Sequence, residues 1–220
     1  MKRKLTFISV IAVLLFVFSA SASALLFDLT YEFDGLLPVQ SYGTVEVTQN
    51  GDDLDFEIIA DTSTLGATAD IHKFYFNLAN GFTGLSISAD NAPNNSYMMI
   101  IGPNLLPAGG AGSSFDWGVD FGDGAGATGN GILQDAIFTL SADQALLTDD
   151  LLELSYPNNT PPVYLAVHFQ GTDTPYTSET VGGNPDNQGN PVPEPATMLL
   201  LGIGFVGFAA IGRKKFFKKP

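Results

Sequence analysis

The sequence predicts an all-β fold: an antiparallel β-sandwich, with the jelly roll as one form of it, and one short helix. Apolar residues alternate with acids or threonines over short runs such as 44–48 and 53–58, which is the pattern of half-buried strands. Clusters of Gly, Asn, Asp and Pro separate the runs, and no long amphipathic segment joins them. We therefore expect a single β-sandwich ectodomain over residues 25–170 that folds on its own.

Nine segments have the composition of strands. They are residues 29–33, 44–48, 53–58, 72–78, 85–88, 97–101, 115–121, 136–140 and 163–170. The short helix is expected to begin at Ser141, because Ser141 and Gln144 have the spacing of a capping box before the apolar run 145–147. Residues 149–154 continue this helix or form a further strand.

The charged residues are divided unevenly along the chain. Basic residues occupy positions 2–4, 213–215, 218 and 219, and Lys73 is the only one between the two groups. All 23 acids lie between Asp28 and Glu194, so residues 25–195 carry 1 − 23 = −22. Such a domain repels phosphate backbones, which excludes nucleic acid as a partner. The chain has no cysteine, so disulfides, thiolate metal sites and cysteine nucleophiles are excluded as well.

The first 24 residues have the three-part layout of a secretory signal peptide. Basic residues 2–4 precede an apolar run over 5–18, and small residues follow at 20–24. We expect signal peptidase to cut after Ala24, with a cut after Ala22 as the second choice. The alternative, an uncleaved membrane anchor, is disfavoured because the apolar run is shorter than the roughly 20 residues that span a bilayer.

The C-terminal part of the chain has three successive segments. Residues 171–195 are rich in Pro and Gly and predict a flexible linker. Residues 196–212 are apolar and uncharged, at the short end of the lengths that form a membrane helix. The basic tail 213–220 marks the cytoplasmic side of that helix.

The linker ends in Pro193-Glu194-Pro195, and the basic tail opens with Arg213, Lys214 and Lys215. This order of motif, short glycine-bearing helix and basic stop resembles the PEP-CTERM sorting signal of Gram-negative bacteria. The resemblance implies retention in the inner membrane with the ectodomain outside the cytoplasm, and cleavage near the motif by an exosortase. It further implies delivery to the cell surface or to an exopolysaccharide matrix. It covers about the last 30 residues and indicates a route rather than a chemistry.

No residue of the chain is predicted to be catalytic. Residues 124–129 match a dinucleotide-binding glycine pattern, but Asn130-Gly131 follows where a helix would have to begin. His72 and His168 are the only histidines, too few for a zinc site of the usual kind. We interpret both as histidines at the edge of the core, with no nucleophile motif beside either one.

Two weaker site hypotheses concern residues 116–123. Asp116, Asp120 and Asp123 surround a glycine-rich loop and could supply oxygen ligands to calcium, although a solvated acidic face is the better explanation. No other cofactor is indicated. Trp117 is the single tryptophan, and it is either a core residue or a platform for a sugar ring.

Three functions are compatible with these features. The first is a non-catalytic protein of the cell surface or of a biofilm and exopolysaccharide matrix. The second is a carbohydrate-binding module. The third is a secreted hydrolase, which is disfavoured because no triad, metal cluster or nucleophile stands out, although abundant acids leave a glycosidase-type carboxylate pair open.

Overall fold

The computed structural model describes residues 24–33, 37–79, 81–89, 97–105, 113–121, 133–157, 162–173 and 177–185. The predicted signal peptide up to residue 23, Asp123, the Pro193–Pro195 motif, the membrane helix and the basic tail lie outside these residues. Within these ranges, no helix has the length and hydropathy needed to cross a membrane.

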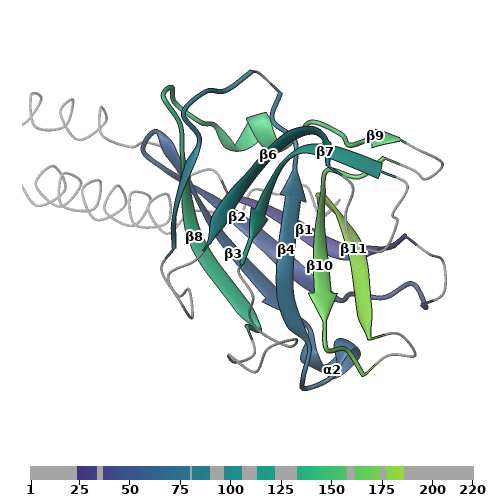
Figure 1. The fold of residues 1–220 in the computed structure, drawn as a ribbon. Helices are drawn as coiled ribbons and strands as arrows, with labels where there is room; N and C mark the ends of the chain where they lie inside the picture. Colours follow the sequence, from purple (N-terminus) through teal and green to yellow (C-terminus); the bar gives the residue numbers. More distant parts are fainter. Residues whose placement is uncertain are drawn as a thin grey trace, which may run out of the picture. The chain divides into compact units, whose positions relative to one another are not determined.

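Eleven strands and two helical turns make up the described fold (Figure 1). The strands are β1 (Ala24–Glu32), β2 (Gly43–Asn50), β3 (Asp53–Ala60), β4 (Asp70–Phe76), β5 (Ser86–Ala89), β6 (Met98–Leu105), β7 (Ser113–Asp120), β8 (Asp135–Ser141), β9 (Tyr156–Pro157), β10 (Leu165–Gln170) and β11 (Ser178–Pro185). The helical turns are α2 (Thr62–Leu65) and a 3-10 turn, η1 (Thr148–Leu151).

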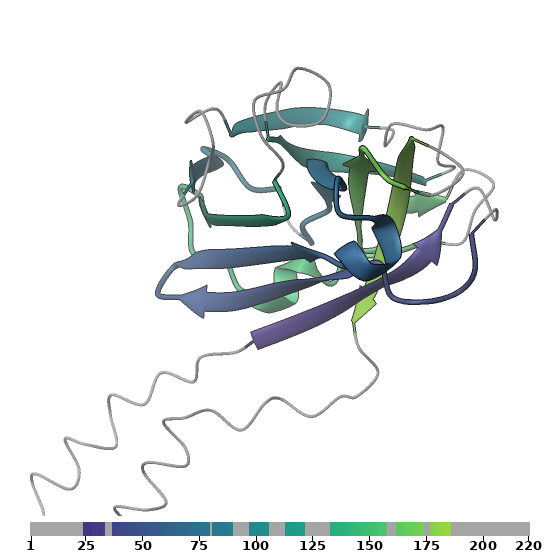
Figure 2. The same ribbon diagram turned by 90° about the horizontal axis from the view of Figure 1, so that it is seen from below.

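The strands form one antiparallel sheet that nearly closes on itself. Its order is β5-β8-β3-β2-β1-β11-β10-β4-β7-β6, and β9 pairs with β7. The two edge strands, β5 and β6, contact each other. Figure 2 shows the wall that contains β1 and β2 on one side and the wall that contains β6 and β7 on the other. The prediction of an antiparallel all-β fold is confirmed. The two layers expected of a sandwich are opposite walls of one continuous sheet.

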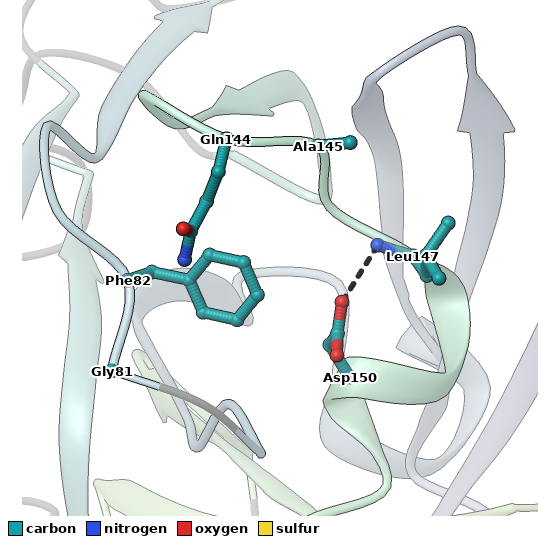
Figure 3. Close-up of a pocket in the computed structure, with 6 residues that line it drawn as sticks. All are labelled: Gly81, Phe82, Gln144, Ala145, Leu147 and Asp150. Atoms are coloured by element: carbon teal, nitrogen blue, oxygen red, sulfur yellow. Dashed lines mark hydrogen bonds between the residues drawn. The ribbon is translucent and has the colours of Figure 1, made fainter.

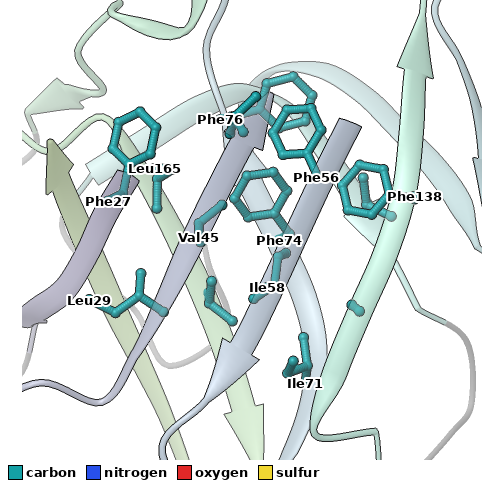
Figure 4. Close-up of a cluster of buried hydrophobic side chains, with 14 of the residues drawn as sticks. Phe27, Leu29, Val45, Phe56, Ile58, Ile71, Phe74, Phe76, Phe138 and Leu165 are labelled. Atoms are coloured by element: carbon teal, nitrogen blue, oxygen red, sulfur yellow. The ribbon is translucent and has the colours of Figure 1, made fainter. Parts of the chain in front are cut away.

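Aromatic side chains fill the space between the walls (Figure 4). Phe56 of β3 stacks on Phe138 of the neighbouring β8, with ring centroids 4.8 Å apart. It also meets Phe74 of β4, at 5.6 Å, across the interior. Each fully buried side chain of this size contributes about 1.5–3 kcal/mol of transfer free energy, so this packing is a main source of stability in a domain without disulfides.

All nine predicted strands are present, but the helix predicted from Ser141 is not. Ser141 is the last residue of β8, and the only helical turn in this region is η1, which begins at Thr148. Leu146 is fully buried, and its backbone N–H donates to the carbonyl of Asp52 at 2.9 Å. Packing onto the β2–β3 turn therefore overrides the local capping pattern.

A short helical turn does occur at α2, where the sequence interpretation did not place one. Asp61 precedes this turn, and its carboxylate accepts hydrogen bonds from the backbone N–H and the hydroxyl of Ser63, at 2.9 and 2.6 Å. The Asp61 carboxylate therefore caps the turn in the usual way for an N-terminal aspartate.

The prediction of a flexible linker over residues 171–195 is wrong for residues 178–185, which form β11. Instead of being a flexible tether, residues 178–185 pair with β1 on one side and with β10 on the other. Val181 is fully buried in the core, and a Cβ on Gly183 would lie 2.6 Å from Leu165 Cδ1. The glycines that suggested a linker are needed because neighbouring side chains pack directly on the backbone there. The remainder of the predicted linker, from residue 186, lies outside the described residues.

The first strand begins, and the last strand ends, on the same side of the domain. β1 and β11 are antiparallel, and Phe27 near the start of β1 pairs with Pro185 at the end of β11. We call this end of the sheet the exit pole. The α2 turn lies at the opposite pole (Figure 1).

Candidate functional site

The exit pole is covered by residues 142–157, which we call the cap segment. It follows β8, and pairing through β3 and β2 places the end of β8 at the same end of the sheet as the start of β1. Leu146 and Leu151 point into the core and close it. The cap segment therefore covers this end of the core with two buried leucines, while neighbouring side chains such as Leu147 and Leu152 are exposed.

Hydrogen bonds from the sheet hold the cap segment in place. The Gln49 side-chain amide donates to the Leu146 carbonyl at 2.7 Å, and its oxygen accepts from the Thr148 N–H at 3.2 Å. Beyond η1, the Asn77 amide donates to the Leu154 carbonyl at 3.0 Å. These bonds tie the backbone on either side of η1 to β2 and to the residue that follows β4, so the path of the cap segment is fixed.

An open hollow of about 520 Å³ lies between the cap segment and the loop after β4 (Figure 3). Phe82 lies on one side, with the Gln144 side chain beside its ring. The Asp150 carboxylate lines another side and accepts the Leu147 N–H at 2.8 Å. The remaining lining residues are Gly81, Ala145 and Leu147. Phe82 is only 6% exposed, so the Gln144 amide and the Asp150 carboxylate are the main polar groups that the hollow offers, and they suit a neutral ligand with hydroxyl groups.

The charges at this hollow disfavour anionic ligands. Lys73 is the only cationic residue between positions 5 and 212. Its ammonium group pairs with Asp120 at 3.4 Å and does not line the hollow. The hollow therefore offers no charged donor to a phosphate or carboxylate ligand, and Asp150 repels such anions.

The two histidines lie together on the β4–β10 pair rather than in the hollow. His72 and Lys73 both stand opposite His168, because the register shifts there through a β-bulge. The histidine ring centroids are 5.9 Å apart, and His168 Nδ1 is 3.0 Å from Thr180 Oγ1. Burial above all, and then the nearby His72 and Lys73, lower the pKa of His168 to about 4. His168 is therefore neutral at neutral pH.

The structure separates the residues proposed for calcium. Asp116 and Asp120 are four positions apart on β7, which is about 13 Å along a strand. Asp116 accepts a hydrogen bond from the Tyr156 hydroxyl at 3.3 Å, whereas Asp120 pairs with Lys73. In the part of the chain that is described, no group of three or more His, Asp or Glu side chains is placed to hold a metal ion.

Trp117 is half-buried and packs against the main core cluster. Its neighbours in the sheet are Phe76 on β4 and Ile101 on β6.

The hollow is lined by Phe82, Gln144 and Asp150, which the sequence interpretation did not select. They come from two loops about 60 positions apart, so no local spacing in the sequence could have brought them together.

Comparison with known proteins gives one finding. The family model of the PEP-CTERM protein-sorting motif matches residues 191–214, which include the Pro193–Pro195 motif and the first basic residues after the apolar run. Neither the curated proteins nor the solved structures include a match. The chain thus carries a PEP-CTERM sorting signal, which marks it as an exported protein sorted through exosortase.

Proposed function

We propose that this protein is held in the inner membrane, cut by exosortase near Pro193–Pro195, and delivered to the cell surface or to an exopolysaccharide matrix as a non-catalytic component. The sorting motif at residues 191–214 carries the proposal. The sequence adds support, because it holds no nucleophile motif, too few histidines for a zinc centre and no cysteine. The high negative charge would also keep a released domain soluble.

Processing is expected to depend on exosortase and on both prolines of the motif. Proline holds the chain extended and free of backbone pairing, as a protease cleft requires. We expect the double variant Pro193→Ala/Pro195→Ala to keep the basic tail, as does the natural sequence in cells without exosortase. Intact mass of the protein from each strain measures this, and it also locates the amino terminus, which we expect at Leu25.

Pro185→Ala is the matched control, since it removes a proline upstream of the matched residues 191–214. It should be processed like the natural protein. If the mature protein retains residues 213–219 in every strain, it is a simple anchored protein and the proposal is wrong.

A second candidate function is carbohydrate binding at the hollow of the exit pole. The specific observation in its favour is that the Gln144 amide, the Asp150 carboxylate and the exposed Leu147 side chain surround an open volume of about 520 Å³ without a cation. Sugars bind through aromatic or apolar faces together with amide and carboxylate hydrogen bonds, and they need no charged donor. A volume of this size accommodates one or two sugar rings.

Gln144→Ala is expected to weaken sugar binding about tenfold, because it removes one polar partner from an open site. Isothermal titration with neutral glucose, galactose and N-acetylglucosamine oligomers measures the affinity. Gln40→Ala is the control, since Gln40 is also exposed but does not line the hollow. Binding that is lost with Trp117→Ala but kept with Gln144→Ala would exclude the hollow and return the site to β7.

A further inference from the structure

The chain between the folded domain and the sorting motif is short. β11 ends at Pro185, and only the seven residues 186–192 precede Pro193. A chain of this length spans at most about 28 Å when fully extended. A protease must also hold several residues on either side of its cleavage site, which shortens the free tether further. The exit pole is therefore within contact distance of any enzyme that holds the motif.

Four of the nine large exposed apolar side chains among the described residues lie on the cap segment at this pole. Leu147, Leu152, Leu154 and Tyr156 of the cap segment are 56%, 39%, 40% and 47% exposed, and we call these four residues the cap patch. The other large exposed apolar residues among those described are Leu26 on β1, Val39 in the loop before β2, Ile59 on β3, and Met98 and Ile101 on β6. Several exposed apolar side chains on one short surface segment are a feature of binding interfaces.

The charges around the cap patch indicate the kind of partner. Asp149 and Glu153 alternate with its leucines along the chain, and no cation accompanies them. An anionic lipid surface would repel such a segment. A protein surface that combines apolar and basic side chains would complement it.

We infer that the cap patch docks on the exosortase while the sorting motif is in its cleft. This inference rests on the proposed function, since it requires exosortase to be the processing enzyme. The short tether holds the exit pole against the enzyme, so that the exposed leucines of the cap patch contact it. Docking then adds binding free energy to that of the motif, so that the folded domain contributes to recognition.

The test changes the cap patch and the tether separately. The patch variant is Leu147→Ser/Leu152→Ser/Leu154→Ser, which leaves the buried Leu146 and Leu151 in place. With the natural tether we expect its processing to be about tenfold slower, equivalent to about 1.4 kcal/mol of lost contact. With twelve Gly and Ser residues inserted after Gly189, the patch variant and the natural sequence should be processed at similar rates. Loss of the basic tail in a pulse-chase experiment measures each rate.

Val39→Ser/Ile59→Ser is the matched control, because these apolar residues are 92% and 45% exposed and lie near the opposite pole. Its rate should equal that of the natural sequence, and circular dichroism melting should show that all the variants fold. Equal rates for the patch and control variants with the natural tether would overturn the inference, as would a patch variant that is slow with both tethers. If the natural sequence itself is processed without exosortase, the proposed function fails and the inference fails with it.

Discussion

A fragment of residues 25–170 is expected to remain unfolded, whereas a fragment of residues 25–189 folds. The shorter fragment lacks β11, which lies between β1 and β10 in the sheet. Its loss would leave two unpaired strand edges in the middle of the sheet and would expose the core next to Val181. A domain of this size is stable by only about 5–15 kcal/mol, which is too little to tolerate the loss of a central strand.

Circular dichroism and urea unfolding distinguish the two fragments. The longer one should give a strand-dominated spectrum and a cooperative transition, and the shorter one neither. Adding a synthetic peptide of residues 177–189 to the shorter fragment should restore the strand signal, because the peptide can supply the missing pairing to β1 and β10. A cooperative transition in the shorter fragment alone would show that β11 is dispensable and that the linker begins at residue 171.

The stability of the domain is expected to change little between pH 7 and pH 4, because two buried groups have opposite effects. Burial raises the pKa of Asp70 from 3.8 to about 6, despite a hydrogen bond from the Leu133 N–H at 2.7 Å. The folded state therefore binds more protons than the unfolded state between about pH 4 and 6. Ionisation of Asp70 costs about 3 kcal/mol as the pH rises through that range.

His168 acts in the opposite direction. Its pKa is lowered from 6.5 to about 4, so the unfolded state binds more protons in this range. As the pH falls from 6.5 to 4, protonation of the unfolded state removes about 3 kcal/mol of stability. The two contributions offset each other over most of the same pH window.

Single substitutions should reveal each contribution. With Asp70→Asn, the free energy of unfolding should fall by about 3 kcal/mol as the pH is lowered from 7 to 4, because the histidine effect is no longer offset. With His168→Gln it should rise by a similar amount over the same range. Urea unfolding at pH 4, 5, 6 and 7 measures both, with Asp173→Asn, at an exposed acid, as the control. Parallel pH profiles for all variants would show that Asp70 and His168 do not control the pH dependence of the free energy of unfolding.

Local patterns in the sequence were sufficient for the fold class and for the sorting signal. Several of the nine predicted strands, such as 44–48 and 53–58, carry their own alternation of apolar and polar residues, and the structure forms a strand at each of the nine. The Pro193–Pro195 motif and the basic stop are likewise contiguous and ordered along the chain, and the family match falls on them. Such features are readable because they depend only on near neighbours in sequence.

Other features depend on residues that are far apart in the sequence, and only the tertiary structure determines them. Residues 178–185 have one large apolar side chain and two adjacent glycines, so their own composition indicates a linker. They form a central strand because β1 and β10 supply hydrogen bonds on both sides, and because Val163 and Leu165 pack over Gly182 and Gly183. The exit pole, the cap patch and the hollow arise in the same way. They are made by segments that only the closing of the sheet brings to one end of the domain.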